Sequence, residues 1–194
     1  MMNALPPVRD RILASATHLF ATTSIRAVSA DKVIADAGTT KVTFYRHFPS
    51  KDHLVVAYLD DQLDQLKEAV DQERMAGQDS CTVLLQLAAA NGRAACRPGF
   101  RGCSFINAAA EYPADGHIVR SAVERYRTWL HDVVTDLLTD LGTDRPGVIA
   151  DQLIMLRDGA MVHGFMGDPT TVTDSLVIAG RAIVAAHTRT PHPA

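Results

Sequence analysis

The sequence lacks the features that mark a membrane protein or a disulfide-linked secreted one. No window of its 194 residues approaches the roughly 18 unbroken apolar residues of a membrane span. The first residues, MMNALPPVRDR, hold no apolar core before a small-residue cleavage site, so we expect no signal peptide. The three cysteines are an odd number without paired metal spacing. Together these absences favour the cytoplasm, where thiols stay reduced.

Signatures of catalysis are also missing. The chain has no phosphate-cradling glycine loop, no HExxH and no paired-cysteine metal site. Cys103 could be a nucleophile with His117 or His131 as its base. Because Cys103 lies next to apolar side chains, a buried small residue is the more ordinary interpretation. We therefore expect no enzyme activity, no metal and no cofactor.

Strict apolar–polar alternation is absent as well, and valine and isoleucine recur at helical spacing instead. The pattern predicts an all-α, nine-helix protein with two domains, at residues 1–50 and 51–194. Prolines, glycines and capping residues place the helices at about residues 7–21, 30–37, 41–48, 51–75, 82–96, 104–111, 117–141, 147–166 and 171–188.

Charge is distributed unevenly along the chain. Residues 1–58 contain seven basic and four acidic side chains, a net charge of +3. The remaining residues contain 12 basic and 18 acidic side chains, a net charge of −6. A basic head on an acidic body suggests that only the head meets a polyanion, although chance asymmetry is the alternative.

The stretch AGTTKVTFYRHFPSKDHL, residues 37–54, concentrates polar and aromatic side chains. Thr40 can cap a helix that Pro49 ends. At 100° per residue, Phe44 and Phe48 share one face, which we expect to be core. The opposite face carries Val42, Thr43 and Arg46, flanked by Tyr45 and His47.

These outward groups suit DNA. An arginine fork matches guanine O6 and N7, an apolar side chain matches the thymine methyl, and Tyr45 and His47 could reach phosphates. A short helix before the tight link Gly38-Thr39-Thr40 is typical of a helix-turn-helix. Lys51 lies in the first turn of the next helix, where a phosphate would offset the unfavourable helix dipole. An ordinary surface helix would show the same polar face, so the pattern alone leaves that alternative open.

Residues 9–54 resemble the DNA-binding domain of the TetR family of transcriptional regulators. The most specific part of the match is TFYRHFPSK, residues 43–51. The chain departs from the family at Ile25, Thr39 and Val42, so the resemblance implies no base preference. Beyond residue 54 the helical layout is similar, and RGCSFINAAAE, residues 101–111, resembles a segment of one branch. The DNA contacts that the resemblance implies are Ser29, Thr40, Lys41, Thr43, Tyr45, Arg46, His47 and Lys51. The exposed face of the helix adds Val42 to this predicted set.

The last two helices carry small residues along one side. Small residues let helices approach closely, so two such helices from each chain would form a two-fold, four-helix homodimer interface. Packing within one chain is the alternative. The predicted interface residues are Gly159, Ala160, His163, Gly164, Ala179, Gly180 and Ile183.

Aromatic and methionine side chains with a few interspersed polar groups favour a pocket for a small, mostly apolar molecule. Arg157 is one such polar group within an apolar helix, although a surface charge is the simpler interpretation. The predicted ligand-binding residues are Phe100, Phe105, Asn107, Glu111, Tyr126, Trp129, Met155, Asp158 and His163.

The sequence therefore predicts an N-terminal helix-turn-helix domain followed by a ligand-binding and dimerisation domain. The expected function is that of a ligand-responsive repressor, which binds a palindromic double-stranded DNA operator as a homodimer and is released by the small molecule. The alternative is a helical protein-interaction module without sequence-specific DNA binding. Residues 38–51 favour the regulator, because an interaction module does not account for them.

Overall fold

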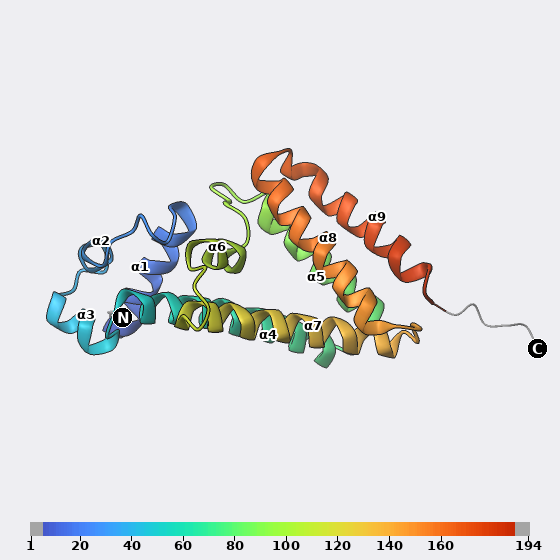
Figure 1. Ribbon diagram of the computed structural model, residues 1–194, viewed down its shortest axis with the longest axis horizontal. Helices are drawn as coiled ribbons and strands as arrows, with labels where there is room; N and C mark the ends of the chain where they lie inside the picture. Colours follow the sequence, from blue (N-terminus) through green and yellow to red (C-terminus); the bar gives the residue numbers. More distant parts are fainter. Residues whose placement is uncertain (1–5, 189–194) are drawn as a thin grey trace, which may run out of the picture. The chain divides into compact units, whose positions relative to one another are not determined.

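The computed structural model describes residues 6–188, and these residues form an all-helical fold. The expected all-α, nine-helix fold is confirmed for this range. No helix in it is both long and apolar enough to cross a membrane. The α-helices are α1 (Val8–Thr22), α2 (Ala30–Asp36), α3 (Lys41–His47), α4 (Lys51–Met75), α5 (Ser80–Ala95), α6 (Ser104–Glu111), α7 (Ile118–Asp140), α8 (Pro146–Met166) and α9 (Val172–Ala185), with a short 3-10 turn, η1 (Pro169–Thr171), before α9 (Figure 1).

Local capping sets most of the helix starts. Ser29 Oγ accepts the backbone N–H of Lys32 at 3.2 Å and opens α2, as the sequence predicts. The prediction is less accurate for α5, which begins at Ser80 rather than near residue 82. The reason is the Asp79 carboxylate, which accepts the backbone N–H of Thr82 at 2.9 Å and so caps the helix earlier.

Packing divides the chain into two compact units, each of which is discontinuous in sequence. The first contains the described chain up to Asp64 together with Ser104–Glu124. The second contains Gln65–Cys103 and the described chain from Arg125 onward. Helices α4 and α7 contribute residues to both units. The functional boundary at residue 50 stays a prediction, because contacts report packing and not activity.

In the first unit, α1, α2 and α3 pack against one another (Figure 1). Phe20 of α1 meets Tyr58 of α4 edge-on, with ring centroids 5.4 Å apart. The Tyr58 hydroxyl in turn donates a hydrogen bond to Ser104 Oγ at 2.8 Å. The side chains of this core therefore tie α1, α4 and the start of α6 together.

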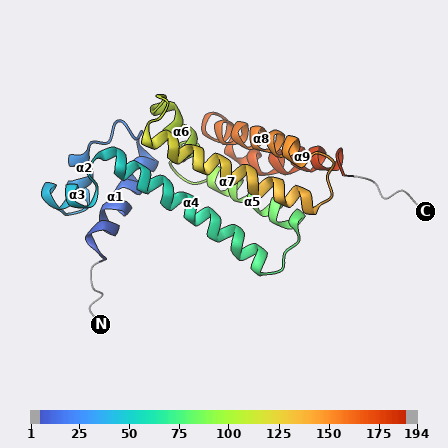
Figure 2. The same ribbon diagram turned by 60° about the horizontal axis from the view of Figure 1, so that its bottom comes forward.

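In the second unit, α5, α8 and α9 lie side by side (Figure 2). They approach closely at small residues. A Cβ added to Gly92 of α5 would lie 1.7 Å from Thr173 Oγ1 of α9, so only glycine fits there without a shift. Apolar residues complete the core in two clusters, one around Val134, Leu138, Ile149 and Ala150 and one around Val70, Val83 and Leu137.

Candidate nucleic-acid interface and effector site

Helices α2 and α3 form the predicted helix-turn-helix. Gly38 turns the chain between them with a φ of 59°, a conformation that favours glycine. Arg11 of α1 holds this turn, because its Nε donates to the Ala37 carbonyl and its Nη2 to the Gly38 carbonyl, both at 3.4 Å. Sequence reasoning missed Arg11, since its partners lie 26 and 27 residues away.

The two faces of α3 are as predicted. Phe44 is fully buried and Phe48 is 2% exposed. On the other side Val42 is 80% exposed, Tyr45 is 41% exposed, and Arg46 is also exposed. A guanidinium, a phenol and an apolar side chain thus project from a short helix whose other face is buried in the core. This arrangement can read base edges and contact phosphates.

The predicted hydroxyl contacts have a structural role as well. Thr40 Oγ1 accepts the backbone N–H of Thr43 at 3.2 Å and opens α3, and the same hydroxyl donates to Thr43 Oγ1 at 3.0 Å. Ser29 caps α2 in the same way. Both residues therefore orient helix starts, whether or not they also contact DNA.

The basic residues predicted to contact DNA differ in their exposure and in their partners within the chain. Lys41 is exposed and pairs with Asp31 at 3.4 Å, whereas His47 is half-buried at the end of α3. Lys51 is also half-buried, and its Nζ donates to the Arg26 carbonyl at 3.3 Å. Burial lowers the pKa of Lys51 from its ordinary value. A phosphate contact by Lys51 stays a prediction, and it would compete with the Arg26 carbonyl.

The fold and the exposed face of α3 define a helix-turn-helix DNA-binding protein. Comparison with known proteins agrees. The profile of the bacterial regulatory proteins of the tetR family matches residues 12–58. The TetR-family transcriptional regulator SCO4454 from Streptomyces coelicolor is 36% identical, with a TM-score of 0.87 over 94% of this chain and 96% of that chain. The chain therefore belongs to the TetR family of transcriptional regulators.

Two further proteins are more distantly similar to this chain. The HTH-type transcriptional regulator YjdC of Escherichia coli K12 is 24% identical over 158 residues, which cover 79% of this chain and 81% of the relative. The reduced form of Escherichia coli NemR is 18% identical, with a TM-score of 0.79 over 96% of this chain and 100% of that chain. At this identity, the likeness to NemR shows the fold alone.

The second unit contains a polar cluster around Arg157, whose side chain is only 16% exposed. Its Nη1 donates to Asp158 Oδ1 at 2.9 Å, its Nε to Asn91 Oδ1 at 3.2 Å and its Nη2 to Cys103 Sγ at 3.3 Å. The guanidinium also lies 5.8 Å from the centroid of the buried Tyr126 ring. Four separate segments therefore meet at one charged side chain.

The charges of this cluster are not balanced. Arg127 also donates to Asp158, so two arginines share one carboxylate. Burial raises the pKa of the Tyr126 phenol, which keeps that group protonated and able to donate. With two arginines and one aspartate, these charged side chains carry a net positive charge.

Only part of the predicted ligand set gathers here. Tyr126 and Asp158 belong to the cluster, whereas sequence reasoning missed Asn91 and Arg127 because their partners lie far away in sequence. Phe105, Asn107 and Glu111 belong to α6 and hence to the first unit. The rest lie elsewhere in the second unit: Phe100 and Trp129 half-buried, Met155 64% exposed, and His163 exposed beside Thr171.

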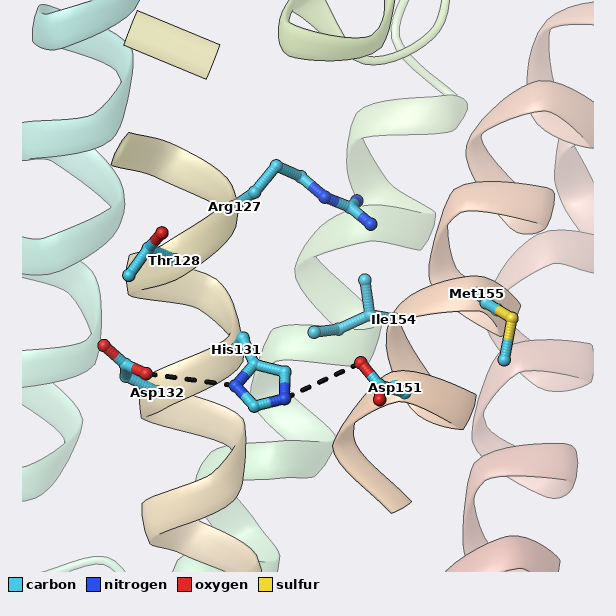
Figure 3. Close-up of a pocket in the computed structure, with 7 residues that line it drawn as sticks. All are labelled: Arg127, Thr128, His131, Asp132, Asp151, Ile154 and Met155. Carbon is cyan, nitrogen blue, oxygen red and sulfur yellow. Dashed lines mark ion pairs between the residues drawn. The ribbon is translucent and has the colours of Figure 1, made fainter. Parts of the chain in front are cut away.

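An open pocket of about 560 Å³ lies between α7 and α8. Figure 3 shows His131 at its centre, between Asp132 and Asp151, with ring nitrogens 3.9 and 3.6 Å from the carboxylate oxygens. Met155 is its one lining residue from the predicted ligand set. Within residues 6–188, no three His, Cys, Asp or Glu side chains gather to hold a metal.

The predicted dimer residues do not all face outward. Gly159 has open space around its Cα and is exposed. Gly164 is buried, and it packs closely against α5: an added Cβ would lie 2.8 Å from the Ala95 Cβ of the same unit. Ile183 packs onto the Val134 cluster, and Gly180 faces Leu153 of the same chain. Ala160 and Ala179 are half-buried, and His163 is exposed.

Proposed function

We propose that this TetR-family regulator is a repressor that binds a palindromic operator as a homodimer and leaves it when a small, mostly apolar molecule binds the second unit. The observation that carries the proposal is the exposed face of α3. Val42 and Arg46 project from a helix whose other side is fixed by two buried phenylalanines. We also propose that it acts in the cytoplasm, where it would meet DNA.

Selection from a random DNA pool with the purified protein tests operator recognition. We expect enrichment of a sequence with two half-sites about one helical turn apart, since each protomer presents one α3. The exposed face of α3 contributes the base contacts, so Val42 and Arg46 should set the preferred positions. A pool without enrichment would reject the repressor and favour a protein-interaction module.

Dimerisation through α8 and α9 is supported by an apolar face that no part of residues 6–188 covers. Met155, Gly159, Val162 and Met166 recur at helical spacing along α8, and all four are exposed. Ile178 of α9 is 69% exposed. Exposed apolar side chains at this spacing are typical of a surface that a second copy covers.

Gly159→Arg would place a bulky cation on this face. We expect sedimentation to report a monomer and operator affinity to fall about a hundredfold, because both half-sites need one stable dimer. Gly147→Arg is the matched control, since Gly147 also has open space but lies on another side of α8. A dimeric Gly159→Arg variant would place the interface elsewhere.

The effector would use the polar cluster for orientation and the aromatic side chains for burial. Tyr126 and Asp158 from the predicted set would act with Arg157, the polar group noted within an apolar helix, and with Asn91, which the structure adds. A thermal-shift screen followed by operator release with each hit tests this step. Molecules that stabilise the protein but leave operator affinity unchanged at saturation would reject the switch and leave only a binding site.

A further inference from the structure

The last residue of α6 forms hydrogen bonds with the loop between α1 and α2. Glu111 Oε1 accepts the backbone N–H of Ile25 at 3.3 Å, and Oε2 accepts that of Arg26 at 2.6 Å. One carboxylate thus holds two consecutive amides that lie 86 and 85 residues away in sequence. Hydrogen bonds to a charged acceptor are stronger than those between neutral groups. The sequence predicts Glu111 as a ligand contact, but in the structure its carboxylate binds the loop between α1 and α2.

Arg26 is held at two further points. Lys51 Nζ donates to its carbonyl at 3.3 Å, and its guanidinium lies 5.9 Å from the centroid of the Tyr112 ring. The Tyr112 hydroxyl donates to Asp52 Oδ1 at 3.3 Å. Residues outside the helix-turn-helix therefore contact the backbone N–H, the backbone carbonyl and the side chain of Arg26.

His117 extends this network from the segment after α6. Its Nε2 lies 3.4 Å from Asp52 Oδ2, and its ring centroid lies 4.9 Å from that of Tyr112. The end of α6 and the start of α7 thus hold both the α1–α2 loop and the first turn of α4.

The position of this loop determines where α3 lies. Ile25 and Val28 are buried, and the next residue, Ser29, caps α2. Because α2 leads into α3 through the tight turn at Gly38, a shift of the loop moves both helices relative to α4 and α6. Two α3 helices can match two half-sites only if each is held at a fixed place.

We propose that Glu111 is a positioning residue for operator binding, which locks the α1–α2 loop to α6 and thereby sets the place of α3. This inference rests on the proposed operator binding. The chain itself connects α6 directly to the Arg157 cluster, so a change in that cluster can be transmitted along α6. Cys103 belongs to the Arg157 cluster, and Ser104, the next residue, begins α6. A molecule that disturbs that cluster would pull on α6 at one end, and Glu111 lies at the other.

Glu111→Gln tests the proposal with little change in volume. The neutral amide removes the charge and replaces one acceptor by a donor, so one of the two amide bonds must be lost. We expect amide hydrogen exchange at Ile25 and Arg26 to quicken about tenfold, and affinity for the selected operator to fall about tenfold, with non-specific DNA binding unchanged. Glu124→Gln, an exposed change in α7, is the matched control and should alter neither.

The two readouts separate a positioning role from a merely structural one. Faster exchange with unchanged operator affinity, measured where the variant is fully folded, would overturn the proposal. If the wild-type protein selects no operator, the proposed function fails instead. If the variant does not fold, exchange in the wild-type protein decides: Ile25 and Arg26 amides that exchange as fast as an open loop would overturn the lock. Tyr112→Phe, which loses only the bond to Asp52, should weaken operator binding less than Glu111→Gln.

Discussion

Arg46 and Arg157 carry the same side chain in opposite surroundings. Arg46 projects into solvent from α3, whereas Arg157 is 84% buried, its side chain being 16% exposed, and donates to three side chains in α8 and its neighbours. An exposed guanidinium keeps its donors for a partner molecule. A buried one is stable only while its own partners remain in place. Exposure thus separates Arg46, which we propose recognises DNA, from Arg157, which joins the side chains of a polar cluster.

Replacing Arg157 by alanine should give the largest effect. The change leaves Asn91 and Cys103 without their donor and opens space beneath Tyr126, so we expect stability to fall by about 3 kcal/mol. For a chain of this size that lowers the melting temperature by roughly 6–12 °C, as circular dichroism would report. Arg181→Ala, an exposed change in α9, should have almost no effect. Equal melting temperatures for both variants would contradict the comparison.

Replacing Arg46 by alanine should act in the opposite way. We expect a loss of about 1–3 kcal/mol on the preferred operator, with relaxed preference at one base position and an unchanged melting temperature. Binding to a panel of single-base operator variants measures this directly. Arg93→Ala in α5 serves as the exposed control away from α3. If the loss were the same for every sequence, Arg46 would contact only the DNA backbone.

Lys51 lies between these extremes, because it is half-buried and bonded to the Arg26 carbonyl. We expect Lys51→Ala to weaken binding to all sequences alike and to reduce the salt dependence by about one unit of slope or less. Titrations at several salt concentrations give the slope. An unchanged slope would mean that Lys51 keeps its intramolecular bond on DNA and makes no phosphate contact.

The titration of Tyr112 should have the smallest effect on stability, and only in alkali. Burial, and then the nearby Asp52 carboxylate, raise its pKa to about 12. The folded protein therefore holds this proton more tightly than the unfolded chain, whose tyrosine pKa is about 10. Its contribution to stability is complete below pH 10 and is lost as pH rises towards 12. The difference between wild-type and Tyr112→Phe absorbance titrations isolates this group, and a midpoint near pH 10 would contradict the prediction.

Local chemistry made the DNA-binding head predictable from sequence. The caps at Ser29 and Thr40, the turn at Gly38 and the phenylalanine face of α3 each depend on residues within four positions of one another. A helical wheel and a short motif are therefore enough to assign them. Asp79 shows that such signals can still be overlooked, since a capping side chain three residues before Thr82 was available in the sequence.

Long-range partners could not be predicted in the same way. Glu111 was expected in a pocket, yet its partners are backbone amides 85 and 86 residues away, which no side-chain pattern records. Gly164 was expected on the dimer surface, but it is the site where α8 approaches Ala95 of α5. Periodicity tells which residues share a face, and only the folded chain determines which neighbour that face meets.

The discontinuous first unit has a consequence for synthesis and for protein engineering. Its last segment ends at Glu124, 60 residues after Asp64, so the ribosome must add those residues before the unit can close. At about 5–20 residues per second this takes roughly 3–12 s. During that time the α1–α2 loop of the nascent chain lacks its contact with Glu111. A chimera that grafts only residues 1–50 onto another body would inherit the same defect permanently. To transplant this DNA-binding specificity intact, the recipient must supply its own carboxylate for the loop at Arg26.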